Sequence, residues 1–171
     1  MDMLDCIMSR RSIRKYHEGA SIPQGDIEKI LTAASAAPSA ANQQPWHFIV
    51  IDDRALLTQL AKENPHGKMV ADASLAIAIS YDKNEKKPYP TLIIDDLSAA
   101  AENILLAAHG LGYGAVWLAI YHDEAKVEST LRILKLTANV VVHSIISIGV
   151  PNESRTARTY LKKEMVHKNG W

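Results

Sequence analysis

The 171-residue sequence is poor in cysteine, since Cys6 is the only one. A single cysteine cannot form an intramolecular disulfide, and the chain has no CxxC or Cys/His framework for zinc. We expect Cys6 to be a small packed hydrophobe rather than a nucleophile. These absences are typical of a protein kept in the reducing cytoplasm.

An excess of one charge and long apolar runs are also missing. The chain carries 19 Lys and Arg against 19 Asp and Glu, so no global field would gather nucleic acid or an anionic membrane. The longest apolar runs, near residues 75–79 and 140–150, are too short to cross a bilayer, and the first residues lack the apolar core of a signal peptide. We therefore expect a cytoplasmic protein with no nucleic-acid or membrane partner.

Sequence motifs for hydrolysis and metal binding are absent as well. There is no G-x-S-x-G, P-loop, HExxH or Asp-rich metal loop, and nothing places any of the seven histidines beside Ser39. His47, His109 and His143 fall in apolar elements, which favours structural roles, with His47 half-buried in a strand. We expect no metal, and a bound cofactor would have to supply any difficult chemistry.

A local basic cluster stands out against this neutral background. Between Arg10 and Lys15, four cations surround Ser12 in the order Arg-Arg-Ser-Ile-Arg-Lys. Cations this close repel one another unless an anion binds between them. If the preceding helix continues, Arg10 and Arg14 lie one turn apart and can hold one phosphate monoester. The alternatives are a solvated basic turn or a nucleic-acid arm, and the latter lacks flanking aromatic residues.

A second cluster, Pro38–Phe48, reads Pro-Ser-Ala-Ala-Asn-Gln-Gln-Pro-Trp-His-Phe. Its small polar residues and prolines predict an ordered loop whose backbone another molecule can approach closely. The alternative is an ordinary connector between a helix and a strand.

Apolar periodicity predicts the elements around these clusters. Helices are expected over 1–9, 23–37, 54–63, 91–111 and 123–134, with Ser21 capping the second, and strands over 46–51, 75–81, 115–120 and 140–150. No linker or repeat divides the chain, so we expect one α+β or α/β domain over residues 1–171. Alanines in the long helix permit close approach by another helix, from this chain or from a second copy, and the segment 152–171 is too apolar for a free tail.

The two clusters, followed by Leu111–Leu118 after a long Ala-rich helix, resemble the nitroreductase family of FMN-dependent NAD(P)H oxidoreductases. The resemblance implies an α+β fold, a three-layer α-β-α sandwich with a mostly antiparallel central sheet. It also implies an intertwined homodimer with FMN at the subunit interface, in which the C-terminal extension 152–171 wraps the partner subunit.

The same resemblance implies which residues bind the cofactor. Arg10, Arg11, Ser12 and Arg14 would hold the FMN phosphate and the neighbouring ring edge. Pro38, Ser39, Ala40 and Asn42 would come from the other subunit. Trp117, Leu118 and Ala119 would form the strand end against the isoalloxazine, with a backbone N–H directed at flavin N5. Arg158 would be the late phosphate-binding cation, with Arg155, Lys162 and Lys163 as alternatives.

The implied activity is a ping-pong transfer of hydride from NADH or NADPH, through flavin N5, to a nitroaromatic, quinone or similar small acceptor. Dehydrogenation and dehalogenation stay open. The sequence departs from longer members of the family in three places. Ala119 and Ile120 stand where those members carry a Glu-Gly pair, and only Lys68 approximates the Asn and Lys that they carry before the second strand. The large helical insertion that covers their active site is also lacking, so the handling of the nicotinamide and the range of substrates are not fixed by the resemblance. The alternatives are a flavin-binding or regulatory protein without efficient NAD(P)H turnover, and a module binding another phosphorylated ligand.

Overall fold

A four-stranded antiparallel sheet forms the centre of the protein. The computed structural model describes residues 1–158 and 160–171. The strands are β1 (His47–Ile51), β2 (Leu75–Asp82), β3 (Gly114–Ala119) and β4 (Val140–Gly149). Their order is β1-β2-β4-β3, and each neighbouring pair is antiparallel. The apolar runs therefore form the central strands β2 and β4, while β1 and β3 are edge strands.

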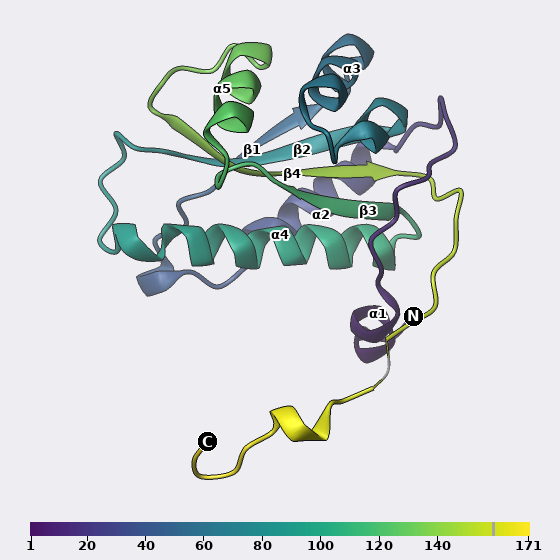
Figure 1. Cartoon of the computed structure of the whole chain (residues 1–171), viewed down its shortest axis with the longest axis vertical. Coiled ribbons are helices and arrows are strands. Elements are labelled where there is room, and N and C mark those ends of the chain that lie inside the picture. Colours follow the sequence, from purple (N-terminus) through teal and green to yellow (C-terminus); the bar gives the residue numbers. More distant parts are fainter. Residues whose placement is uncertain (159) are drawn as a thin grey trace.

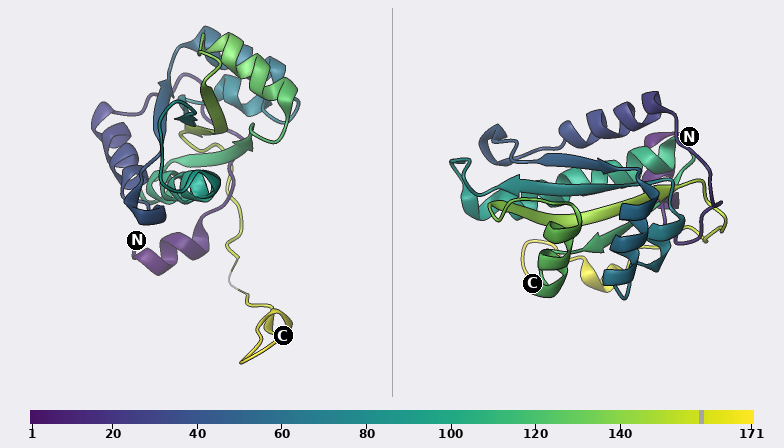
Figure 2. Two further views of the ribbon diagram at one scale, coloured as in Figure 1. Left: turned by 90° about the vertical axis from the view of Figure 1, so that its left-hand side faces the viewer. Right: turned by 90° about the horizontal axis from the view of Figure 1, so that it is seen from above.

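Helices cover both faces of this sheet (Figure 1). α2 (Gln24–Ser35) and α4 (Ile93–Gly110) lie on one face, and α3 (Arg54–Glu63) and α5 (Glu124–Ile133) lie on the other (Figures 1 and 2). Short 3₁₀ turns are η1 (Ala40–Asn42), η2 (Lys68–Asp72), η3 (Pro90–Leu92) and η4 (Lys163–Met165). The predicted α+β fold, a three-layer α-β-α sandwich, is confirmed.

The alternation of side chains along β2 explains why the two faces differ. Leu75, Ile77 and Ile79 pack into the cluster that contains α2 and α4, whereas Ala76 and Ala78 face the cluster of α3 and α5. Successive residues of a strand point to opposite faces, so large side chains meet the long helix α4 and alanines leave room for α3 and α5. All five are at most 2% exposed, so β2 is covered on both faces.

Both ends of the chain leave this core. α1 (Met3–Ser9) has no buried residue, and the segment after β4 runs past α1 and away from the sheet (Figures 1 and 2). Leu4 is 66% exposed, Met165 70% and Trp171 fully exposed. Exposed apolar side chains in this number are typical of surfaces that bind a partner. No helix in the described part of the chain has the length and hydropathy to span a bilayer.

Several predicted boundaries were wrong. The first helix starts at Met3 rather than at residue 1. It ends at Ser9 as predicted, since Arg10 adopts an extended conformation (φ −56°, ψ 132°), and it therefore does not carry the basic cluster. Pro23, not Ser21, occupies the N-cap of α2, which ends at Ser35 rather than 37. β1 begins at His47 rather than 46. The His47 side chain is 53% exposed and pairs with Glu85 at 2.8 Å, which excludes the half-buried position expected for it.

Candidate functional site

The basic cluster lies in extended form along the free edge of β3. Ser12 forms a parallel bridge with Ala115, and the Ile13 N–H donates to the Ala115 carbonyl at 3.0 Å. Gly114 makes this approach possible, because a Cβ there would lie 2.6 Å from the Ile13 side chain. Alternation in an extended chain places Arg10, Ser12 and Arg14 on one side. The cluster is therefore assembled by pairing with the sheet rather than by a helical turn.

A cavity of about 350 Å³ opens beside this segment. It is lined by residues of α1, of the basic cluster and of the C-terminal segment: Ile7, Met8, Arg10, Arg11, Ser12, Arg14, Arg155 and Arg158. Five arginines and, among the described residues, no carboxylate line it, a composition suited to a phosphate monoester. The structure thus brings all four predicted residues of the cluster together with Arg158. Arg155 joins them, whereas Lys162 and Lys163 do not line the cavity.

Carboxylates outside the lining hold these arginines in place. Arg10 Nη2 lies 3.1 Å from Glu102 Oε1, and the buried Arg10 Nε has no hydrogen-bond partner among the described residues. Glu153 accepts from the Arg14 backbone N–H at 2.6 Å and pairs with Arg155 at 2.9 Å. The Arg14 N–H, and then Arg155, lower the pKa of Glu153. A buried donor without a partner is costly, so Arg10 Nε is unused hydrogen-bonding capacity next to the cavity that Arg10 lines.

The C-terminal segment is tied to the same place. The Arg158 N–H donates to the Met8 carbonyl at 3.3 Å and the Asn152 N–H to the Lys15 carbonyl at 2.8 Å, while Arg11 donates to the Thr156 carbonyl. These bonds bring the late arginines back to the early ones.

A second cavity, of about 450 Å³, borders the first and shares Arg14 with it. It runs along β3 and is lined by Arg14, Asn64, His66, Met69, Val116, Trp117, Leu118, Ala119 and Lys126. The three strand residues predicted for the ring site are among them. Each cavity falls in the range of about 300–1,000 Å³ that holds small ligands.

The edge of β3 presents backbone donors to this second cavity. The Ala115 carbonyl points away from β4, since it accepts from Ile13. In an antiparallel pair, successive residues direct their N–H and C=O groups alternately toward and away from the partner strand. Trp117 and Ala119 therefore direct their N–H groups to the free edge, where they can bind the polar edge of a heteroaromatic ring.

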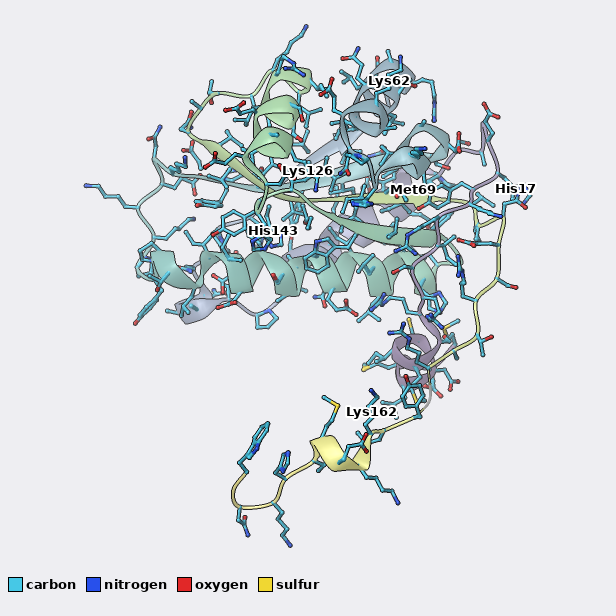
Figure 3. The ribbon with its side chains drawn as sticks, in the orientation of Figure 1. His17, Lys62, Met69, Lys126, His143 and Lys162 are labelled. Atoms are coloured by element: carbon cyan, nitrogen blue, oxygen red, sulfur yellow. The ribbon has the colours of Figure 1, made fainter. Side chains whose placement is uncertain are left out.

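Sequence reasoning missed Asn64, His66, Met69 and Lys126. Asn64 is 7% exposed, and its side chain accepts from the His66 N–H at 3.0 Å. Both residues belong to the Asn-Pro-His-Gly turn, and this turn was the sequence feature that could have indicated them. Lys126 Nζ lies 3.2 Å from Asp123, and nothing in its sequence context indicated a site. Figure 3 shows Met69 and Lys126 on the α3 and α5 side of the sheet. Lys68 lines a separate hollow instead.

The loop residues Pro38, Ser39, Ala40 and Asn42 line neither cavity. The Ala40 N–H donates to Asp96 at the start of α4, whereas α1 contacts α4 through Cys6 and the Leu106 carbonyl. Ten residues of helix separate Asp96 from Leu106, about 15 Å at a rise of 1.5 Å per residue. One chain does not bring its own loop and its own basic cluster together.

The two less exposed histidines have structural surroundings. His143 is 5% exposed, stacks edge-on against Trp117 at 5.5 Å and lies 3.3 Å from Ser98 Oγ. Burial, and then His122, lower its pKa to about 4. His109 lies 2.8 Å from Ser9 Oγ, and burial followed by Arg10 lowers its pKa. Over residues 1–158 and 160–171, no cluster of His, Cys, Asp or Glu side chains could hold a metal.

The fold and the site define a class of protein: an α-β-α sandwich with an arginine-lined cavity and a second cavity along the edge strand β3, the two sharing Arg14. The chain belongs to the nitroreductase family, whose model, described as "Nitroreductase family", matches residues 7–66 and 58–150.

Relatives cover the whole chain. A protein of Methanothermobacter thermautotrophicus named "Putative NADH dehydrogenase/NAD(P)H nitroreductase" is 41% identical over 171 residues, 100% of this chain and 88% of that one. An FMN-dependent nitroreductase from Clostridium difficile has a TM-score of 0.90 at 33% identity, covering 99% of this chain and 100% of that one. A Desulfovibrio desulfuricans structure, solved in complex with FMN, has a TM-score of 0.84 at 29% identity, covering 98% and 96%.

Proposed function

We propose that the protein is a homodimeric FMN-dependent NAD(P)H oxidoreductase that passes hydride to a nitroaromatic, quinone or similar small acceptor by a ping-pong mechanism. The observation that carries the proposal is the arginine-lined cavity, which shares Arg14 with the cavity along β3. Family membership and the names of the relatives support an FMN-dependent NAD(P)H oxidoreductase.

The residues present fit FMN at both ends. Arg10, Arg11, Ser12, Arg14 and Arg158 hold the phosphate, and the unpaired Arg10 Nε supplies one of the donors that a phosphate oxygen needs. Trp117, Leu118 and Ala119 hold the ring system at the edge of β3. Bound there, FMN would supply the hydride-transfer chemistry between NADH or NADPH and the acceptor.

The work of the chain itself is positioning and electrostatics. The Trp117 and Ala119 N–H groups donate to the polar ring edge, and the cation of Arg14 stabilises negative charge that develops there. Because no side chain has to act as a nucleophile or metal ligand, the lack of such motifs in the sequence is consistent with the reaction.

The site is completed by a second copy of the chain. Ser39, Ala40 and Asn42, with Pro38, come from the partner's loop, since one chain does not bring its own loop to the cavity. The exposed apolar residues of α1 and of the extension 152–171 form the interface, with the extension wrapped over the partner. Residues 1–171 act as one domain of this dimer, in the cytoplasm that the lone cysteine favours.

The first test of the proposal is the visible absorption spectrum of the purified protein, which reports bound flavin. The purified protein should show a flavin spectrum, or acquire one when FMN is added, and should elute as a dimer in size-exclusion chromatography. A colourless monomer that cannot be reconstituted with FMN refutes the proposal. If such a protein still binds inorganic phosphate, a module for another phosphorylated ligand is the better description.

Stopped-flow mixing with NADH or NADPH then separates an enzyme from a flavin-holding protein. Ala119 offers the ring only a methyl group and Ile120 is 1% exposed, so neither side chain handles a nicotinamide. This favours, as a second candidate, a regulatory protein that keeps its flavin oxidised. Bleaching of the flavin by either nucleotide, followed by reoxidation with a quinone, supports the enzyme; a flavin that stays oxidised supports the second candidate.

A further inference from the structure

A buried carboxylate holds the loop that follows α2. Asp96 lies in the first turn of α4 and is 5% exposed. Its Oδ1 accepts from the Ala40 N–H at 2.9 Å, and its Oδ2 accepts from Gln43 Nε2 at 2.6 Å. Buried carboxylates are rare unless their oxygens are paired. Both oxygens of Asp96 accept hydrogen bonds from this loop.

Gln43 is fixed just as firmly. Its Nε2 also donates to the Tyr89 carbonyl at 3.1 Å, and its Oε1 accepts from the Tyr89 N–H at 3.0 Å. Turning the amide over would set its oxygen against a carboxylate and a carbonyl, so only one orientation satisfies these groups. Lys87 Nζ adds a bond to the Gln43 carbonyl at 3.2 Å. The loop is therefore held from α4 and from the segment that precedes it.

The held conformation is one that the loop would not adopt alone. Ala41, Asn42 and Gln44 have φ values of 47°, 55° and 43°, in the left-handed region that disfavours residues with a Cβ. Such residues persist where the surrounding structure over-determines them, and they cluster at functional sites. Local bonds such as the one from the Gln44 N–H to Ser39 Oγ at 3.0 Å shape the turn, whereas Asp96 ties it to the fold.

We propose that Asp96 is a positioning residue for the FMN site of the partner subunit, acting through Ala40 and Gln43 on the conformation of Ser39–Asn42. The inference rests on the proposed function. It assigns a part in cofactor binding to a residue that lines neither cavity of its own chain.

The first test compares Asp96→Asn with its exposed neighbour, Asp95→Asn. The amide introduced by Asp96→Asn is nearly isosteric with the carboxylate, but either orientation of it sets an NH₂ against a donor, the Ala40 N–H or Gln43 Nε2. Both aspartates lie in the first turn of α4, so both variants lose the same favourable interaction with the helix dipole. Any difference between them therefore has another cause. In fluorescence titrations of the apoprotein, the Kd for FMN should rise by about tenfold or more in Asp96→Asn. The Kd of Asp95→Asn should equal that of the wild-type protein. Equal affinities in the two variants overturn the inference.

The second test uses heterodimers, because a merely structural defect would not complement. One chain carries Arg10→Ala and the other Asp96→Asn, with different affinity tags for purification. If each loop serves the partner's flavin, both defects fall in one site and the other site is intact. One FMN per heterodimer should then bind with wild-type affinity. A heterodimer with no such site overturns the assignment to the partner.

Failure of the function and failure of the inference give different results. A wild-type protein that binds no FMN refutes the function. Hydrogen–deuterium exchange of residues 39–44 then decides whether Asp96 orders the loop: faster exchange in Asp96→Asn supports it, and unchanged exchange overturns it. If Asp96→Asn does not fold, Gln43→Met removes the same clamp from the loop side, with the same expected loss of FMN affinity. Wild-type affinity in that variant overturns the inference.

Discussion

Replacing Arg10 by alanine should weaken FMN binding and leave riboflavin binding nearly unchanged. Arg10 lines the first cavity with its Nη2 3.1 Å from Glu102, and its buried Nε has no partner among the described residues. Riboflavin shares the ring and the ribityl chain with FMN but lacks the phosphate. The difference between the two ligands therefore isolates the predicted role of Arg10.

The magnitude follows from the bonds that are lost. A hydrogen bond to a charged group contributes about 1.5–3 kcal/mol. Arg10→Ala removes one hydrogen bond from the guanidinium to the phosphate and weakens a second, which costs about 3 kcal/mol, or about two orders of magnitude in Kd. The variant also frees Glu102, whose side chain is 43% exposed, and exposed pairs of this kind contribute at most about 1 kcal/mol. The phosphate contact should dominate, and Arg10→Ala/Glu102→Gln tests this by removing the freed carboxylate.

The assay is quenching of flavin fluorescence on titration into apoprotein, at two salt concentrations. Arg158→Ala serves as the comparison, since Arg158 lines the same cavity from an exposed position and should have the smaller effect. The reasoning is refuted if Arg10→Ala weakens FMN and riboflavin equally, because Arg10 would then support the fold and not the phosphate. Equal losses in Arg10→Ala and Arg158→Ala would contradict the ranking of the two arginines.

Three further predictions concern the core, the pH dependence and the extension. Gly149→Ala should destabilise the fold by about 1–3 kcal/mol, since its Cβ would lie 2.8 Å from the Tyr16 ring; an unchanged urea midpoint would contradict this packing. The folded pKa of His143 is about 4, below its ordinary 6.5, so stability should fall between pH 6.5 and 4 by at most about 1.4 kcal/mol per unit, and His143→Gln should flatten that dependence. Deleting residues 152–171 should abolish the dimer and the flavin absorbance; a yellow dimer would refute the wrapped extension.

The sheet was predictable because each strand carries a local signal. β2 begins with the continuous apolar run Leu75–Ile79, and β4 is mostly apolar apart from His143, Ser144 and Ser147, as expected of strands covered on both faces. The glycines after α4 mark its end. The first helix ends at residue 9 as predicted, but the extended course of the basic cluster was not predictable, because it depends on the pairing of Ser12 with Ala115. That pairing joins residues about a hundred positions apart, and local propensity carries no information on it.

The candidate site divides in the same way. The basic cluster that lines the first cavity was expected, because Arg10, Arg11 and Arg14 are crowded into one segment of an otherwise neutral chain. Asn64 and Lys126 come to the second cavity from the end of α3 and the start of α5, and only the packing of both helices on the sheet brings them together. Asp96 looks in the sequence like one of two acidic residues at a helix start, and only its burial distinguishes it from Asp95.

The edge of β3 bears directly on the residues in which this chain departs from longer members of its family. The direction of a backbone N–H is set by strand pairing and not by the side chain. The Ile120 N–H turns inward and donates to the His143 carbonyl at 3.2 Å, so the Ala119 N–H faces the cavity whatever residue stands there. Loss of the Glu-Gly pair therefore removes side-chain contacts and conformational freedom but leaves the donor in place. Since hydride transfer belongs to the cofactor, the departure bears on how a nucleotide and an acceptor bind, and that binding separates the enzyme from a protein that keeps its flavin oxidised.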